Sequence, residues 1–159
     1  LRFWRSFVKT VIVYESTHHQ NTLKLVKAIV DTYGSDGSVK AVSIENEKSI
    51  NLNDYDFIGL ASVIDNGYFY SAMENYANRV PRGKKVFLIY TSGSGFHYVD
   101  TVARTLKGRG CSIIGEYTCK GFDTAGMWKS IGGVAKGHPT EEEIENAVKF
   151  YGKLIGEAK

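Results

Sequence analysis

Short runs of apolar residues alternate along the chain with stretches in which apolar residues recur every three or four positions. The runs have the length of buried β-strands, and the periodic stretches are typical of amphipathic helices. Five strands are predicted, at residues 9–14, 39–44, 56–62, 85–91 and 112–119. Helices are predicted around four apolar stripes, at residues 25–33, 73–80, 99–106 and 144–155. This alternation predicts an α/β fold, in which a parallel sheet carries helices on both faces.

Capping residues mark several helix ends. Asn21 is a predicted N-cap of the first helix, and Gly34 is its predicted stop. Ser71 with Glu74, and Thr140 with Glu143, have the spacing of a capping box before an apolar stripe. Residues 45–55 lack a clear helical period, so we expect only a short or irregular helix there.

The polarity of the strands predicts their order. The first, third and fourth runs are almost continuously apolar, as central strands of a parallel sheet should be. The second run carries Lys40 and Ser43, and the fifth carries Glu116 and Thr118, so these two runs are expected at the edges. The pattern therefore predicts a three-layer fold with a five-stranded parallel sheet of order 2-1-3-4-5.

The totals suit one domain of ordinary composition. Of 159 residues, 43% are hydrophobic and 23% are charged, which is usual for a globular domain. We assign residues 9–159 to that domain and treat residues 1–8 as an N-terminal extension. The apolar runs are too short to cross a membrane. The formal charge of +3 comes without a basic stripe, so we expect neither a membrane nor a nucleic-acid partner.

The two cysteines indicate a reducing compartment. Cys111 and Cys119 flank one predicted strand, which would hold them roughly 25 Å apart, beyond the reach of a disulfide. Free thiols favour a cytoplasmic protein. No Cys and His spacing fits a zinc site, and no catalytic Ser-His-Asp set is visible. We therefore predict no metal ligand and no catalytic side chain.

The predicted topology places a ligand site beyond the carboxyl ends of the strands, where the strand order reverses. Three loops meet there. The first contains Ser16, Thr17, His18, His19, Gln20, Asn21 and Thr22 and leads into a helix. Hydroxyl, amide and backbone N–H groups at a helix amino end suit an anion. A polar turn with an N-cap would have the same composition, so the loop alone leaves both interpretations open.

The other two loops have compositions that suit a flat ligand. Residues 62–70 combine the turn dipeptide Asn66-Gly67 with three consecutive aromatic residues, which either contact a ligand ring or pack against the next helix. Residues 91–98 are rich in Gly and Ser, so their backbone could approach a ring closely. The pair Gly93 and Gly95 does not make a dinucleotide-binding motif, because Tyr98 stands at the third glycine position.

Several short motifs resemble the flavodoxin family. Residues 16–22 resemble the flavodoxin phosphate loop, T/S-x-T-G-x-T, and are closer to a branch of short members with the loop S-x-H-H-G-N-T. That branch also carries G-F-D-T and K-G-H-P, which stand here at residues 121–124 and 136–139. The resemblance covers about residues 8–157.

The resemblance implies a flavodoxin-like fold that binds FMN and transfers electrons to a redox partner protein, as a monomer. It also implies that Asn66-Gly67 is the turn beside the flavin ring. The FMN-binding residues that follow from the three loops are Ser16, Thr17, His18, His19, Gln20, Asn21, Thr22, Ser62, Val63, Ile64, Asp65, Asn66, Gly67, Tyr68, Thr91, Ser92, Gly93, Ser94, Gly95 and Phe96.

Two features depart from the family. Gln20 replaces the glycine of the phosphate loop, where a positive φ would favour glycine. The chain is also mildly basic, whereas flavodoxins that carry electrons are typically acidic. Two alternatives therefore stay open: an NAD(P)H-dependent FMN or quinone oxidoreductase on the same fold, and a flavodoxin fold that has lost FMN. A phospho-receiver domain is excluded, because the third strand ends in Ala61-Ser62 where a receiver needs Asp.

Overall fold

The computed structural model describes residues 7–15, 19–94, 99–124 and 126–157. The described strands are β1 (Thr10–Tyr14), β2 (Val39–Ser43), β3 (Phe57–Asp65), β4 (Tyr68–Phe69), β5 (Lys85–Ser92) and β6 (Ser112–Lys120). The helices are α1 (Asn21–Tyr33), α2 (Ser71–Tyr76), α3 (Asp100–Gly108) and α4 (Glu141–Glu157). Short 3-10 turns are η1 (Ile44–Ser49), η2 (Leu52–Asp54), η3 (Ala77–Arg79) and η4 (Gly126–Ile131).

The sheet has the predicted order. Its strands run β2-β1-β3-β5-β6, and every neighbouring pair along this path is parallel. The two strands with mixed polarity, β2 and β6, are the edges, as predicted. One strand was not predicted: β4 pairs antiparallel with the end of β3, so that part of the second predicted loop is a hairpin.

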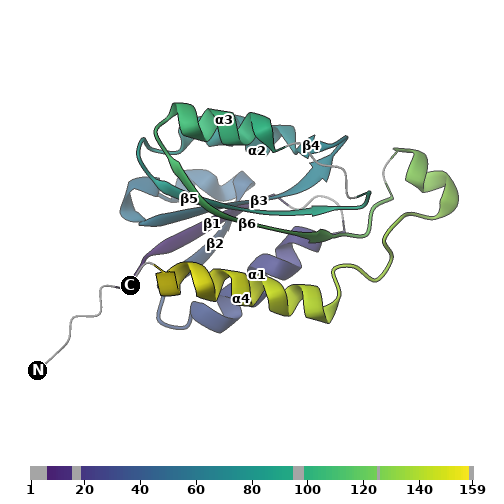
Figure 1. Ribbon diagram of the computed structural model, residues 1–159, viewed down its shortest axis with the longest axis horizontal. Helices are drawn as coiled ribbons and strands as arrows, with labels where there is room; N and C mark the ends of the chain where they lie inside the picture. Colours follow the sequence, from purple (N-terminus) through teal and green to yellow (C-terminus); the bar gives the residue numbers. More distant parts are fainter. Residues whose placement is uncertain (1–6, 16–18, 95–98, 125, 158–159) are drawn as a thin grey trace, which may run out of the picture.

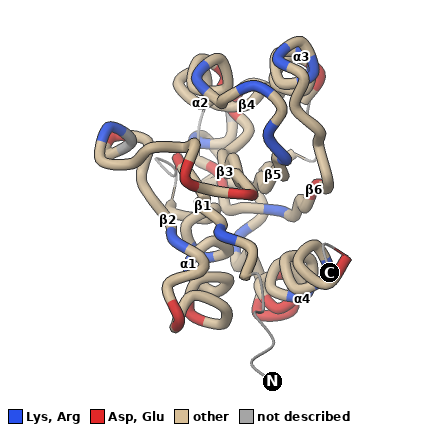
Figure 2. The backbone as a smooth tube through the Cα atoms, turned by 90° about the vertical axis from the view of Figure 1, so that its left-hand side faces the viewer, with Lys and Arg blue, Asp and Glu red and all other residues tan. Residues whose placement is uncertain are grey.

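Helices cover both faces of the sheet (Figure 1). α2 and α3 lie on one face, and α1 and α4 lie on the other, which Figure 2 shows from the end of the sheet. Because successive strand residues point to opposite faces, the apolar runs feed two separate cores. Val11, Val13, Leu60 and Leu88 pack toward α2 and α3, whereas the side chain of Ile12 packs toward α1 and α4. The near-continuous apolar strands are explained by this two-sided burial.

One of the two predicted capping boxes is present in the structure and the other is not. The capping box before α4 is confirmed, since the Thr140 N–H donates to Glu143 Oε2 (2.7 Å) and the Glu143 N–H donates to Thr140 Oγ1 (3.2 Å). The box predicted for Ser71 is wrong, because Ser71 is already the first residue of α2 and Tyr70 stands before it. The irregular link is confirmed as two 3-10 turns, η1 and η2.

The structure also bears on the predictions for the cysteines, the N-terminal extension and membrane-spanning segments. Cys111 and Cys119 are free thiols, as predicted. Most of the predicted extension lies outside the described residues, but Val8 already packs against the core under α1 and α4. None of the described helices is long and apolar enough to cross a membrane.

Candidate functional site

The amino end of α1 lies at the carboxyl end of β1. Gln20 precedes the helix with φ 54° and ψ 29°, and within the described residues its side chain makes no capping hydrogen bond. The first turn of α1 contains no acidic residue. The first N–H groups of a helix have no partner inside it and carry the positive end of the helix dipole. This end of α1 is therefore suited to an anion.

The predicted N-cap role of Asn21 is wrong, because Asn21 is the first residue within the helix. Its side chain turns sideways instead, and Nδ2 donates to the Phe122 carbonyl at 2.8 Å. Asn21 is only 3% exposed, and its Oδ1 has no hydrogen-bond partner among the described residues. A buried acceptor without a partner is rare in folded proteins and marks a place where a ligand or a water can bind.

Thr22 and His19 have different surroundings. Thr22 is fully buried, and its hydroxyl lies 3.2 Å from the hydroxyl of Thr91 on β5. The exposed imidazole of His19 lies over the ring of Phe122, with centroids 4.4 Å apart, and its Nε2 is 3.0 Å from Thr124 Oγ1. The hydroxyl of Thr22 therefore ties α1 to the sheet, whereas His19 connects the first loop to residues 122–124.

The second predicted loop is mostly a hairpin. Asp65 pairs with Tyr68, and the two residues between them have φ of 50° (Asn66) and 86° (Gly67). A two-residue turn with both φ values positive matches a type I′ turn, for which Asn-Gly is the preferred sequence. The predicted turn is thus confirmed, but β3 continues three residues beyond its predicted end.

Within this hairpin the side chains divide between the core and the surface. Ser62 and Val63 are buried, and the Ser62 hydroxyl donates to the Val63 carbonyl (2.9 Å) and accepts from the Tyr70 N–H (3.2 Å). Phe69 is buried edge-on against Tyr90, as the packing interpretation of the aromatic residues expected. Tyr68, by contrast, is 49% exposed.

The third loop continues β5. Thr91 and Ser92 are the last residues of that strand and are buried, Gly93 is buried after them, and Ser94 is exposed. A Cβ at Gly93 would stand 2.6 Å from Asp123 Cβ, so the chain from residue 121 onward passes directly against this glycine. The predicted site residues Ser16, Thr17, His18, Gly95 and Phe96 lie outside the described residues.

All three loops meet at one small cavity of about 10 Å³, room for about one water molecule. It is lined by residues of the first loop (Asn21), the hairpin (Val63, Ile64) and the third loop (Thr91, Ser92, Gly93), and also by Gly121, Phe122 and Asp123. The last three were not among the predicted site residues. Two sequence signals could have pointed to them: the unusual length of the link between β6 and α4, and the G-F-D-T motif.

Comparison with known proteins agrees with this fold. No family model matches the chain. An uncharacterized protein from Methanocaldococcus jannaschii is 34% identical over 154 residues, which cover 93% of this chain and 99% of that protein. A flavodoxin from the domain Archaea superposes with a TM-score of 0.68 over 94% of this chain and 97% of that structure, at 16% identity. Oxidised Flavodoxin 2 from Bacillus cereus gives a TM-score of 0.64 over 95% and 99%, at 19% identity.

The chain has a flavodoxin-like fold. It belongs to one family with the uncharacterized protein from Methanocaldococcus jannaschii. At the position where the flavodoxin phosphate loop has glycine, this chain has Gln20. Gln20 nevertheless adopts the left-handed conformation that favours glycine. His19 beside it has φ 53° as well. Gln20 therefore holds the positive φ that favours glycine at this position, at a conformational cost.

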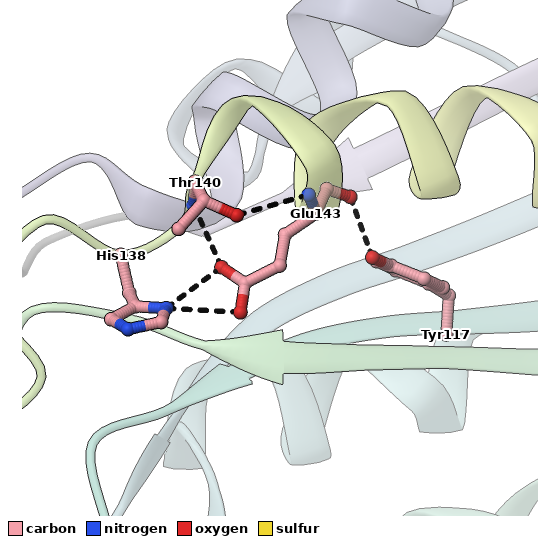
Figure 3. A network of polar contacts seen from close by, with 4 residues as sticks. All are labelled: Tyr117, His138, Thr140 and Glu143. Carbon is pink, nitrogen blue, oxygen red and sulfur yellow. Dashed lines mark hydrogen bonds and ion pairs between the residues drawn. The ribbon is translucent and has the colours of Figure 1, made fainter.

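The far end of the link between β6 and α4 is held by a second polar network (Figure 3). His138 Nδ1 lies 2.9 Å from both carboxylate oxygens of Glu143, and the Tyr117 hydroxyl donates to the Glu143 carbonyl. Burial, together with the Glu143 charge, raises the pKa of the Cys119 thiol to about 12. An unreactive thiol and a histidine paired with a capping residue indicate that this network has a structural role.

Proposed function

We propose that this flavodoxin-like protein binds one FMN at the carboxyl ends of β1, β3 and β5 and passes electrons to a partner protein. The observation that carries the proposal is the buried Asn21 Oδ1, which has no hydrogen-bond partner among the described residues and lies at the amino end of α1, whose first turn contains no acidic residue. An anion is favoured there by the helix dipole. A ribityl hydroxyl would give Asn21 Oδ1 the donor that it lacks. The donor set therefore fits the phosphate and ribityl end of FMN.

In this proposal each loop has a separate task. The first loop, with the candidate residues Ser16, Thr17, His18, His19, Gln20, Asn21 and Thr22, holds the phosphate. The hairpin residues from Ser62 to Tyr68 and the third-loop residues from Thr91 to Phe96 hold the ring. Once bound, FMN supplies the electron-transfer chemistry that the side chains lack.

The size of the cavity restricts how the ring is held. A space of about 10 Å³ cannot enclose a flavin ring, so the ring would lie against the outer rim of the site or part the segments that line it. Tyr68 is the half-exposed aromatic residue of the hairpin, whereas Phe69 is committed to the core. We therefore assign the ring contact to Tyr68, among the three aromatic residues of this segment.

The partner is proposed to be a redox protein with an acidic surface. The η4 turn projects beyond the carboxyl ends of β5 and β6 (Figure 1). It carries the exposed Lys129 and Ile131, and Lys136 is exposed shortly after it. Ile131 is 68% exposed. Residues 126–140 contain no Asp or Glu, so this projection offers basic groups around an apolar contact.

Electron transfer between purified proteins tests this function. The FMN-loaded protein is reduced anaerobically and mixed by stopped flow with acidic cytochrome b5 or with basic cytochrome c. We expect transfer to both, with the rate to cytochrome b5 falling and the rate to cytochrome c rising as salt is added, since salt screens attraction and repulsion alike.

Charge-reversed variants locate the docking surface. Lys129→Glu combined with Lys136→Glu should weaken the salt dependence toward cytochrome b5, whereas Lys107→Glu on α3 should leave it unchanged. If electrons pass to neither cytochrome, the carrier role is contradicted. Steady oxidation of NAD(P)H with a quinone would instead support the oxidoreductase alternative.

A further inference from the structure

Residues 121–139, which we call the strap, connect β6 to α4 and cross the amino end of α1. Three interactions join the two across about a hundred residues of sequence. Asn21 Nδ2 donates to the Phe122 carbonyl (2.8 Å), the His19 imidazole packs on the Phe122 ring, and His19 Nε2 lies 3.0 Å from Thr124 Oγ1. The strap residues involved, Phe122 and Thr124, thus hold the two residues on either side of Gln20.

Glycines allow the strap to approach the sheet and the helix so closely. A Cβ at Gly121 would stand 2.7 Å from Asn21 Nδ2 and 3.0 Å from Thr91 Cβ. A Cβ at Gly133 would stand 2.5 Å from the Phe122 ring. Heavy atoms at such distances overlap, so a larger residue at position 121 would push the strap away from α1, and one at position 133 would disturb the packing within the strap. The sequence of the strap is therefore fitted to this contact.

The strap is also braced from within and at its far end. The Phe122 N–H donates to the His138 carbonyl (3.0 Å), and Asp123 and Val134 exchange two backbone hydrogen bonds of 3.0 and 2.8 Å. His138 in turn pairs with Glu143 at the start of α4 (Figure 3). The residues that contact α1 are thus fixed relative to a helix on the body of the domain, which lets them orient His19 and Asn21.

We propose that Phe122 and Thr124 are positioning residues for FMN: Thr124 acts on the phosphate through His19, and Phe122 acts on the ribityl chain through Asn21. This inference rests on the proposed function, because it assumes that the anion at α1 is the FMN phosphate. Thr124 fixes one ring nitrogen of His19, which leaves the other to face a ligand. Because the strap and the ligand order the same two side chains, each favours the other, and their effects on affinity are reciprocal.

Removal of the Thr124 hydroxyl tests the positioning role. Thr124→Val keeps the shape of the side chain, Thr124→Ser keeps the hydroxyl, and Thr118→Val on the exposed edge of β6 is the matched control. We expect Thr124→Val to weaken FMN binding about three- to tenfold, the range for one lost hydrogen bond, and riboflavin binding less than twofold. Thr124→Ser and Thr118→Val should bind both ligands like the wild type.

A purely structural strap would give a different result. Equal weakening of FMN and riboflavin by Thr124→Val, or no weakening of either, would overturn the inference while leaving the proposed function intact. If the wild-type protein binds no FMN, the proposed function and this inference both fail. The comparison of the two ligands therefore separates the two failures.

Protection of the strap from trypsin tests the reciprocal effect. Lys129 and Lys136 are exposed within the strap and are potential cleavage sites. Saturating FMN should slow cleavage at both by at least threefold, whereas saturating riboflavin, which lacks the phosphate, should have little effect. Cleavage after Lys107 on α3 is the internal control, and its rate should be the same with FMN as with riboflavin. Equal protection by the two ligands, or none by either, would overturn the coupling.

Discussion

Gln20 offers a direct test of the loop geometry through the substitution Gln20→Gly. Gln20 adopts φ 54° and ψ 29°, and its side chain is exposed. A non-glycine residue in this conformation costs about 1–2 kcal/mol, because its Cβ approaches the following carbonyl oxygen. Glycine avoids that cost but loses more backbone freedom on folding, about 0.5–1 kcal/mol. The expected net gain in the free energy of unfolding is about 0.5–1 kcal/mol.

The assay is urea unfolding followed by circular dichroism, with Gln20→Ala as the matched variant. Alanine removes the same side chain but keeps the Cβ, so it should change the stability by less than about 0.5 kcal/mol. Lys24→Gly, at an exposed position within α1, should lose about 1 kcal/mol, which controls for a general effect of glycine. The slope of the transition should be the same for all variants. If Gln20→Gly is no more stable than Gln20→Ala, the loop is not strained at this position.

Three further changes test other parts of the account. Gly121→Ala should lower the free energy of unfolding by about 1–3 kcal/mol in urea, since its Cβ would overlap Asn21, whereas Gly108→Ala, which meets open space, should not. Because the pKa of Cys119 is raised to about 12, iodoacetamide at pH 8 should alkylate it about a thousandfold more slowly than free cysteine. The alkylation rate, read by mass spectrometry, should rise about tenfold per pH unit. A rate equal to that of free cysteine would contradict the burial of the thiol. Gly67→Ala forces a Cβ onto φ 86° and should cost about 1 kcal/mol. If this turn changes shape on reduction, a midpoint potential will also move by an amount on the order of tens of millivolts, and unchanged midpoints would exclude the turn from tuning.

Much of the fold could be predicted from the sequence because its signals were local. The apolar runs correctly predict the strands of the parallel sheet. The mixed polarity of residues 39–44 and 112–119 correctly predicts that these two strands lie at the edges of the sheet. The pair Thr140 and Glu143 was recognised because a capping box has a fixed spacing. The hairpin strand β4 is not predicted, because its two residues, Tyr68 and Phe69, are too short a run to show a strand pattern and are assigned to the loop after the third strand.

The site was predicted only in part, because part of it depends on contacts distant in sequence. The composition of the first loop and the Asn66-Gly67 turn marked two segments that the structure brings to one cavity. The residue type of Asn21 predicts a cap, but in the structure its side chain donates to the carbonyl of Phe122 instead. No local pattern could reveal that interaction, since the two residues are a hundred positions apart in sequence.

Calorimetric titration of the ligand-free protein with FMN tests whether the chain binds this flavin at all. We predict saturable binding of one FMN per chain, because the three loops converge on one site, where the amino end of α1 lies beside the buried Asn21. Absence of binding at millimolar FMN would contradict the account and identify the chain as a flavodoxin-like fold that no longer holds a flavin.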